Sequence, residues 1–284
     1  MTIDPRQAGS DRRDLAQALR SLRLASGLSG ERLAVRCGMS QSKISRIETG
    51  RVLPSVVDVR QIVRALEVDD ETVAQLVSLA RVANTEYEDV RASVRRGLHH
   101  RQRELASLES SATHLRYFLP TMPTGLIQTA SYMHAAMSHP MAAAHGDVAR
   151  VIALKLQRQE ALRDTSKRFD FLLTESAVRW RLCSPEVMSL QIDRLVELSF
   201  QPSIRIDVLP LLRFVPEAPF QTFTVYDRAL VTAELFSGRI VLRDPKDVDH
   251  YTALFEYFQQ HADTGDDARR LLRRWADEFR AEAE

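Results

Sequence analysis

Five polar side chains able to contact a nucleic acid lie within six consecutive positions, at Gln41, Ser42, Lys43, Ser45 and Arg46. A glutamine can form two hydrogen bonds with adenine and an arginine two with guanine. Each such pair contributes about 1–3 kcal/mol of discrimination between bases. The segment 41–48 contains a single acid, Glu48. The cluster therefore has the chemistry expected of a surface that meets DNA.

Short helices with clear start and stop signals are predicted around this cluster. Ser29 and Ser40 each precede an apolar-periodic stretch and are placed to cap a helix. Gly38 supplies the positive φ that a tight turn between those helices requires. A helix, a small turn and a second helix with polar N-terminal residues predict a helix-turn-helix, whose second helix enters the major groove. The predicted helices cover residues 14–25, 30–37, 41–49, 55–66 and 69–79.

The segment SGLSGERLAVRCGMSQSKISRIETGRVLPS closely resembles the lambda-repressor-like XRE family of DNA-binding domains, and the resemblance spans residues 15–66. In that family the first, second and sixth residues of the recognition helix tend to touch bases. Carried over by position, the resemblance implies base contacts by Gln41, Ser42 and Arg46.

The same resemblance implies further roles. The residues that match the family's contacts to the DNA backbone are Ser29, Ser40, Lys43 and Arg51. The two serines would hold phosphate at helix N-termini. Glu48 matches an acid that pairs with an arginine of the first helix, here Arg23. One departure is Gly30, where the family usually has a glutamine that touches phosphate, so that contact is expected to be missing or weaker.

Charge is divided unevenly along the chain, although the net charge is only +1. Residues 1–65 contain twelve Lys and Arg against six Asp and Glu, whereas the remainder contains 27 against 32. This asymmetry predicts that only the N-terminal part meets a polyanion. Two cysteines are too few for a disulfide framework. No apolar run approaches the ~20 residues needed to cross a bilayer. No secretory signal is visible, so a cytoplasmic, nucleoid-associated protein with no membrane partner is expected.

Residues 83–112 are predicted to form one long charged helix, with an apolar stripe at Val90, Val94, Leu98, Leu105 and Leu108. Either an amphipathic helix lying on the C-terminal part or a dimer-forming arm fits this pattern. The predicted organisation is therefore a DNA-binding domain over 1–82, a helical connector over 83–112, and a regulatory and dimerisation domain over 113–284.

The C-terminal part mixes two kinds of pattern. Four β-like runs and five helical stretches occur together in this part, which predicts an α+β or α/β domain after an all-α N-terminal bundle. The β-like runs are 168–173, 204–209, 220–226 and 229–235, and the helical stretches are 128–138, 147–163, 185–198, 248–260 and 268–283.

FLPTMPTGLIQTASYM, together with LQRQEAL, FDFLLTESAVR, VMSLQIDRL, IRIDVLP and FQTFTV, resembles a further family. These are actinobacterial XRE regulators with a large C-terminal domain of unknown biochemistry and a PGLLQT-type motif. Here the motif reads Pro123-Thr124-Gly125-Leu126-Ile127-Gln128-Thr129, with Thr124 between the usual Pro and Gly. The resemblance covers about residues 15–260 and implies an antitoxin-like or developmental regulator encoded beside a small partner protein.

Polar residues in this C-terminal part could line a pocket for a ligand or a partner. They are Gln128, Thr129, Tyr132, Arg158, Gln159 and Glu175. The alternative is that they form internal hydrogen bonds that hold a helix on the sheet. That alternative is favoured because most buried polar residues serve structure.

Signals of catalysis or metal binding are lacking in the sequence. It contains no CxxC or HExxH pattern, and neither GxSxG nor GxxxxGK[ST]. We therefore expect no metal site, no catalytic residues and no cofactor, and a protein that is not an enzyme.

Taken together, these patterns predict a transcription regulator that binds a palindromic operator as a homodimer, with half-sites about 34 Å apart. A small protein from a neighbouring gene is the expected source of the regulatory signal. Two alternatives remain: the C-terminal domain is a small-molecule sensor, or the chain is a DNA-tethered enzyme.

Overall fold

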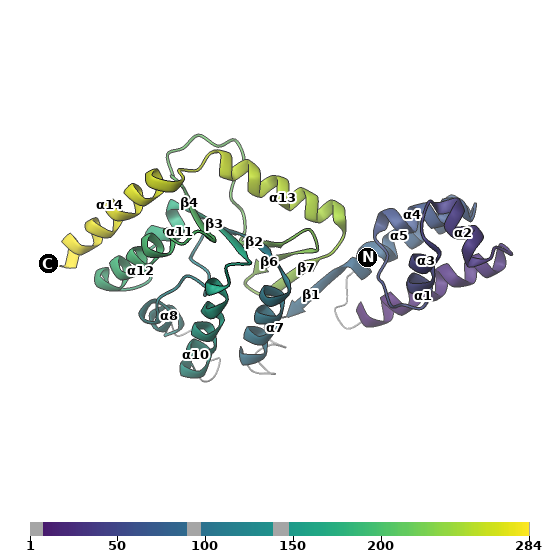
Figure 1. The fold of residues 1–284 in the computed structure, drawn as a ribbon, viewed down its shortest axis with the longest axis horizontal. Helices are drawn as coiled ribbons and strands as arrows, with labels where there is room; N and C mark the ends of the chain where they lie inside the picture. The colour runs from purple at the N-terminus through teal and green to yellow at the C-terminus, as the bar shows by residue number, and fades with distance from the viewer. Residues whose placement is uncertain (1–7, 90–97, 139–147, 284) are drawn as a thin grey trace. The chain divides into compact units, whose positions relative to one another are not determined.

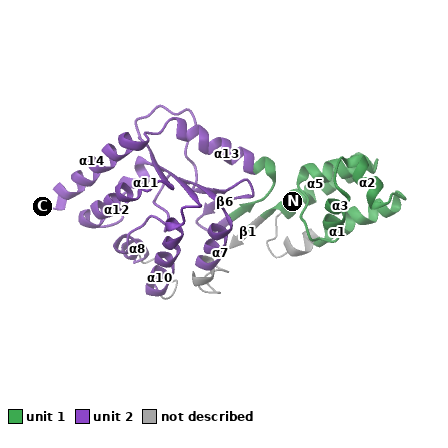
Figure 2. Cartoon of the chain, in the orientation of Figure 1, with its two compact units in different colours: residues 1–88, 240–247 green, residues 89–239, 248–284 purple. Residues whose placement is uncertain are grey.

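The computed structural model describes residues 8–89, 98–138 and 148–283. The chain divides into two compact units, coloured separately in Figure 2. Unit 1 comprises residues 1–88 and 240–247, and unit 2 comprises residues 89–239 and 248–284. Each unit has its own hydrophobic core.

Unit 1 is a bundle of short helices, as the sequence predicted (Figure 1). Its core is formed by the apolar faces of these helices, with Leu19, Leu33, Ile44, Ile47 and Val59 all nearly inaccessible to solvent. The helices are α1 (Ala8–Ala25), α2 (Gly30–Cys37), α3 (Gln41–Glu48), α4 (Val56–Ala65) and α5 (Asp70–Asn84).

A distant segment of the chain, residues 240–247, also belongs to unit 1. The buried carboxylate of Asp244 accepts a hydrogen bond from the backbone N of Val56, the first residue of α4, at 3.0 Å. The backbone N of Arg243 donates to the carbonyl of Asn84 at 3.1 Å. Domain boundaries drawn along the sequence could not include this segment, because nothing local signals a contact between residues almost two hundred positions apart.

Unit 2 is built on a mixed sheet in which its strands follow the order β6-β5-β2-β3-β4, and strand β7 begins in unit 2 and continues into the segment 240–247 of unit 1. The neighbours β2, β3 and β4 run parallel, whereas β5 pairs antiparallel with both β2 and β6. The strands are β2 (His114–Leu119), β3 (Arg168–Thr174), β4 (Ile204–Leu209), β5 (Phe223–Tyr226), β6 (Leu230–Leu235) and β7 (Gly238–Leu242).

Both faces of this sheet are covered by helices (Figure 1). On one face, Phe169 and Phe171 pack in the same core as Leu272 and Trp275 of α14. On the other, the ring of Phe118 stacks on that of Phe258 in α13, with centroids 4.6 Å apart. The remaining elements are α7 (Leu98–Ser111), α8 (Ala130–Met137), α10 (Val148–Arg158), a 3₁₀ turn (Gln159–Arg163), α11 (Glu175–Arg179), α12 (Pro185–Leu198), α13 (Pro245–Gln260) and α14 (Gly265–Ala283).

The continuous helix predicted over 83–112 was wrong. Helix α5 ends at Asn84, residues Thr85–Asp89 form strand β1, and α7 begins at Leu98. The alternating Thr85 and Tyr87 suit a strand, and long-range pairing overrides a helical period that is weak at this point. Val90 and Val94, part of the predicted apolar stripe, lie outside the described residues.

Candidate functional site

Helices α2 and α3 are joined by the tight turn that the sequence predicted. Gly38 has φ 64°, in the left-handed region that favours glycine. The backbone N of Met39 donates to the carbonyl of Ala34 at 2.9 Å, which closes the end of α2. The hydroxyls of Ser29 and Ser40 accept from the backbone N of Arg32 and Lys43, both at 3.2 Å. Local hydrogen bonds alone therefore set where each helix begins and ends.

One face of α3 is buried and the other is open. Ile44 and Ile47 are 1% and 0% exposed, whereas Gln41, Ser42 and Arg46 are exposed. The Nε of Arg46 donates to the carbonyl of Ser42 at 3.2 Å, which holds the guanidinium stem along the helix. The three residues expected to touch bases therefore lie on the open face of one helix, with hydrogen-bonding capacity left for a partner.

The residues expected to touch phosphate are in more varied surroundings. Ser29 and Arg51 are exposed, while Lys43 is half-buried. The Nζ of Lys43 forms an ion pair with the Oδ1 of Asp58 at 2.7 Å. The sequence analysis missed this partner, although Asp58 had a visible signal. It stands three residues after Ser55, and the two make the capping box of α4.

The expected ion pair between Arg23 and Glu48 is present and is bidentate. The Nε and Nη2 of Arg23 donate to the two carboxylate oxygens of Glu48 at 2.6 and 2.8 Å. The Nη1 of Arg23 also donates to the carbonyl of Leu28 at 2.9 Å. The bond to Glu48 raises the pKa of Arg23 above its ordinary value. The pair connects α1, α3 and the entry to α2, so its role is to hold the helix-turn-helix together.

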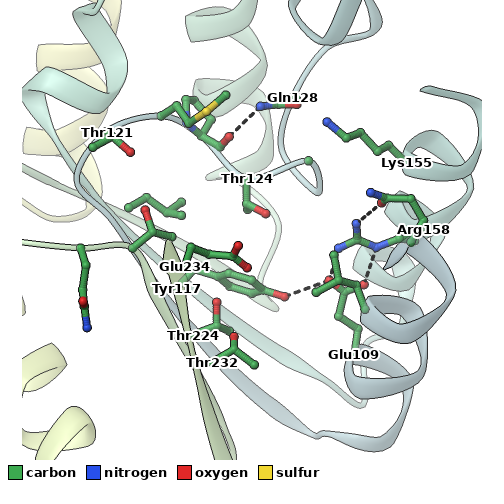
Figure 3. A pocket seen from close by; sticks show the side chains of 18 of the residues that line it. Glu109, Tyr117, Thr121, Thr124, Gln128, Lys155, Arg158, Thr224, Thr232 and Glu234 are labelled. Carbon is green, nitrogen blue, oxygen red and sulfur yellow. Dashed lines mark hydrogen bonds and ion pairs between the residues drawn. The ribbon is translucent and has the colours of Figure 1, made fainter. Parts of the chain in front are cut away.

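Unit 2 contains a cavity of about 650 Å³ on the sheet face that α7 and α10 cover (Figure 3). Its floor is the inward face of β2, β5 and β6, where Thr224 and Thr232 stand opposite each other in the register of the two strands. Thr224 is also the register partner of the larger Tyr117 on β2. The hollow follows from this change in side-chain size across the sheet.

A buried network forms one wall of the cavity (Figure 3). The guanidinium of Arg158 on α10 makes a bidentate ion pair with Glu109 on α7. The Nε of Arg158 lies 3.0 Å from the Oε2 of Glu109. Arg158 also donates to the side-chain oxygen of Gln102, and the hydroxyl of Tyr117 donates to Glu109 at 3.2 Å. Arg158 and Glu109 are 7% and 1% exposed, so each neutralises a charge that solvent cannot reach.

The network also fixes protonation states. Burial, followed by the charge of Glu109, raises the pKa of Tyr117 well above its ordinary value. Burial raises the pKa of Tyr226, another wall residue, to about 12. Burial lowers the pKa of Arg158, but its bond to Glu109 and the charge of that carboxylate raise it further, and the net shift is upward. The wall therefore presents two neutral phenols and a charge pair that cancels itself.

Each of the two units matches a known protein family. The family described as "Domain of unknown function (DUF5753)" matches residues 102–274, which is more than half of the chain. The chain belongs to the DUF5753 family. The family described as "Helix-turn-helix domain" matches residues 14–76. This match bears out an N-terminal helix-turn-helix unit joined to a C-terminal domain of unknown function, and it supports DNA as the partner of unit 1.

Solved structures give only distant likenesses to this DUF5753 protein. NucT from Helicobacter pylori has a TM-score of 0.39 and 11% identity, covering 64% of this chain and 98% of that chain. Nuc, a phospholipase D family member from Salmonella typhimurium, has a TM-score of 0.33 and 10% identity, covering 57% and 90%. TrmBL2, an archaeal chromatin protein, has a TM-score of 0.34 and 10% identity, covering 64% and 53%. Likenesses of this size are too distant to bear on function, and no curated protein matches the sequence.

The structure does not bring the six predicted pocket residues of the DUF5753 domain together. Gln128 and Arg158 line the cavity, but the other four lie outside its lining. Thr129 caps α8 by accepting from the backbone N of Tyr132 at 3.2 Å, and Tyr132 itself is buried in the core. These residues serve the internal structure, as the alternative interpretation held.

The other two residues also have structural partners. The amide of Gln159 donates to the carbonyls of Gly125 and Gln128, at 2.9 and 2.7 Å. Glu175 accepts from Arg179 at 2.6 Å and from the backbone N of Leu211 at 3.0 Å. The sequence left a shared pocket open as the less favoured interpretation, because the spacing of these polar residues does not show which strand end or turn each of them faces.

Sequence reasoning missed most of the cavity's wall. Glu109, Tyr117, Lys155, Thr224 and Thr232 line it and come from five different elements. Two signals were available: Glu109 and Arg158 are charged residues on the apolar faces of amphipathic stretches. Charged residues in such positions are almost never fully buried unless they are paired.

Within 8–89, 98–138 and 148–283, no group of three or more His, Cys, Asp or Glu side chains has an arrangement that could hold a metal ion. Over the same residues, none of the helices combines the length and apolar character needed to traverse a bilayer.

Proposed function

We propose that this protein is a sequence-specific transcription regulator that binds a palindromic operator as a homodimer. The observation that carries the proposal is the open face of α3, where Gln41, Ser42 and Arg46 are exposed beside the capped N-terminus at Ser40. A recognition helix needs this combination, because its N-terminal residues reach base edges while the helix end holds the backbone. The basic excess of residues 1–65 supports the same partner.

Unit 2 is proposed to receive the regulatory signal. The sequence favoured a small partner protein, with a small-molecule sensor as the alternative. The 650 Å³ cavity favours the small molecule, because its volume lies within the ~300–1,000 Å³ typical of ligand sites. We propose a cytoplasmic, nucleoid-associated protein for both cases.

We also propose that the chain is not an enzyme. The carboxylates best placed along the sequence for acid–base chemistry are Glu175 and Asp207. Glu175 pairs with Arg179 at 2.6 Å, and Asp207 pairs with Arg205 at 2.7 Å. In the cavity, Glu109 is paired with Arg158. Each of these three carboxylates is engaged by an arginine, so none of the three is poised as a proton acceptor toward a substrate.

The test is selection of the operator by the purified full chain from random double-stranded DNA, followed by gel-shift titration of single-base variants. We expect one palindromic sequence to be enriched. Arg46→Ala is expected to lose preference at one base pair in each half-site, a change of about 1–3 kcal/mol in discrimination. Arg81→Ala, which removes an exposed arginine from α5, is the matched control and should leave the preference unchanged.

Two outcomes would count against parts of the proposal. An Arg46→Ala protein with unaltered base preference would show that the recognition face is assigned wrongly. A monomer bound to a single half-site, measured by analytical ultracentrifugation of the protein–DNA complex, would contradict the dimer. Lys43→Ala should weaken all sequences about equally, because a phosphate contact carries no base information.

A further inference from the structure

We propose that the cavity of unit 2 binds an uncharged small molecule with a flat apolar ring system, which Phe220 and Phe236 cover at the mouth of the cavity, and with a polar group that lies among the hydroxyls farther in. The inference rests on the sensing role proposed for unit 2 and names the class of ligand. Its test is direct binding without DNA, so its failure and a failure of operator binding can be told apart.

The paired strands β5 and β6 give the cavity a floor whose exposure increases toward one end. Thr224 and Thr232 stand opposite each other in the register and are 6% and 2% exposed. Nearer the outer end, the backbone N of Glu234 donates to the carbonyl of Thr222 at 2.9 Å, and both of these residues are half-buried. All four residues line the cavity. The floor therefore runs from buried threonines to half-buried polar groups.

Two aromatic side chains continue this floor to the mouth of the cavity. Phe220 precedes Thr222 by two residues, Phe236 follows Glu234 by two residues, and both rings belong to the cavity lining. Phe220 is 85% exposed and Phe236 is fully exposed. Removing an apolar ring from water is favourable, so a ligand that covers these two rings gains affinity from the burial of both partners.

The chemistry of the two rings favours a flat apolar partner. Aromatic rings attract one another in offset-stacked and edge-to-face arrangements, beyond the gain from burial alone. Phe214 offers a comparison within the same exposed stretch, because it is 84% exposed but does not line the cavity. Only the aromatic residues of the lining are therefore expected to contribute to ligand binding.

The charges of the lining indicate an uncharged ligand. Among the residues that the structure describes, four charged side chains line the cavity, two acidic and two basic: Glu109, Glu234, Lys155 and Arg158. Glu109 and Arg158 form an ion pair with each other. A ligand with a net charge would meet no matching excess of the opposite charge, whereas an uncharged ligand keeps the lining balanced.

Hydroxyl groups supply the polar part of the lining. Thr121, Thr124, Thr224 and Thr232 are drawn around the cavity in Figure 3, and Thr222 also belongs to its lining. A threonine hydroxyl can donate a hydrogen bond or accept one, so these residues suit a polar ligand group of either kind. A ligand with a polar group at one end can therefore enter the cavity without leaving that group unsatisfied.

The experiment uses prodan, 6-propionyl-2-dimethylaminonaphthalene, as the probe. It is uncharged, has a flat apolar ring system with a ketone, and emits at shorter wavelength where water is excluded. We expect saturable one-to-one binding to the full chain, with a blue shift. Phe220→Ser and Phe236→Ser should each weaken binding about 2- to 12-fold, the equivalent of an aromatic contact worth about 0.5–1.5 kcal/mol. Because both side chains are exposed, their replacement leaves the core intact.

Two further variants separate the cavity from the exposed loop. Phe214→Ser is the matched control, because it removes an equally exposed ring that does not line the cavity, and it should leave the affinity unchanged. Thr222→Trp places a large side chain at a half-buried position of the lining and should abolish binding. Circular dichroism of each variant checks that the chain is folded.

Four results would overturn the inference. They are the absence of saturable binding, an unchanged affinity in either Phe220→Ser or Phe236→Ser, an equal loss in Phe214→Ser, and full affinity in folded Thr222→Trp. An equal loss in Phe214→Ser would place the probe on the exposed loop, and full affinity in Thr222→Trp would place it outside the cavity. A chain that selects an operator but gives any of these results would contradict this inference alone.

Discussion

The recognition face of α3 and the cavity of unit 2 are built in opposite ways. Every residue assigned to the first lies between Arg23 and Arg51, and the three side chains expected to touch bases are exposed. The wall of the second is drawn from residues 102 to 236, and its polar groups are mostly buried. Exposed groups need only a correctly placed backbone, whereas buried groups must also satisfy one another.

Two ion pairs, one in each unit, show the same contrast. Arg23 and Glu48 in unit 1 are 12% and 10% exposed, so water still reaches them. Arg158 and Glu109 in unit 2 are 7% and 1% exposed and belong to a network with Gln102 and Tyr117. Removing one member should therefore have a larger effect in unit 2 than in unit 1.

The largest expected effect is that of Glu109→Gln. It leaves the Arg158 guanidinium buried without a counter-charge, and breaking a buried pair in this way costs about 3–5 kcal/mol. Denaturant unfolding followed by tryptophan fluorescence measures unit 2 selectively, because Trp180 and Trp275 both belong to it. The double variant Glu109→Leu with Arg158→Met should recover most of the loss. A double variant as unstable as the single one would show that packing, not charge, is what the network contributes.

A smaller effect is expected for Glu48→Gln, about 1–3 kcal/mol, because the pair in unit 1 is partly solvated and its arginine keeps the bond to Leu28. Amide hydrogen exchange of α1 and α3 should report the loss. The order of preferred bases in a gel-shift titration should stay the same. A changed order would mean that Glu48 acts in base recognition and not only in holding the helices.

Removing helix caps should give equal effects in the two regions. Ser40→Ala and Thr129→Ala each delete a side-chain oxygen that accepts from a backbone N at 3.2 Å, and a cap of this kind contributes about 1 kcal/mol. Exchange of the first-turn amides of α3 and α8 measures both. Thr129→Ser, which keeps the oxygen, is the control. A much larger loss for Thr129→Ala would reveal a role beyond the cap.

The smallest effects are on pH dependence, where the two regions should differ in sign. Burial raises the pKa of Asp207 in unit 2, and its bonds to Arg205 and Gln259 offset this only in part. The folded state then takes up a proton before the unfolded chain does, so stability is gained as the pH falls from neutral through that raised pKa. Asp207→Asn should be more stable than the natural protein at pH 7, with the difference closing toward about pH 4.

Asp69, the exposed N-cap of α5 in unit 1, should behave in the opposite way. Hydrogen bonds from Thr72 lower its pKa, so its contribution is present above the unfolded value of about 3.9 and is lost as the pH falls through the lower folded pKa. Asp69→Asn should be less stable than the natural protein at pH 7, with the difference closing only below about pH 4. Exchange of α5 amides measures this, and tryptophan fluorescence measures Asp207→Asn. Equal signs for the two variants would contradict the contrast between exposed and buried carboxylates.

The predictability of the two regions follows from how local their interactions are. The spans of α2, α3 and α12 follow from nearby caps and apolar spacing, and Pro185–Leu198 has the predicted bounds. Strand β2, by contrast, was not predicted. It lies between β3 and β5, with buried residues such as Leu115 on one face and Phe118 on the other, and so it shows no clean alternation of apolar and polar residues.

The sequence by itself determined the helix-turn-helix, because Ser29, Gly38, Ser40 and Ile44 act on neighbours within a few residues. It also determined that the C-terminal part mixes helices and strands. Only the tertiary structure decided that Thr85–Asp89 is a strand and that residues 240–247 join unit 1. It also decided that Glu109, Gln128 and Arg158 border one cavity. Those outcomes depend on contacts between residues tens to hundreds of positions apart, and no periodicity or cap along the chain encodes them.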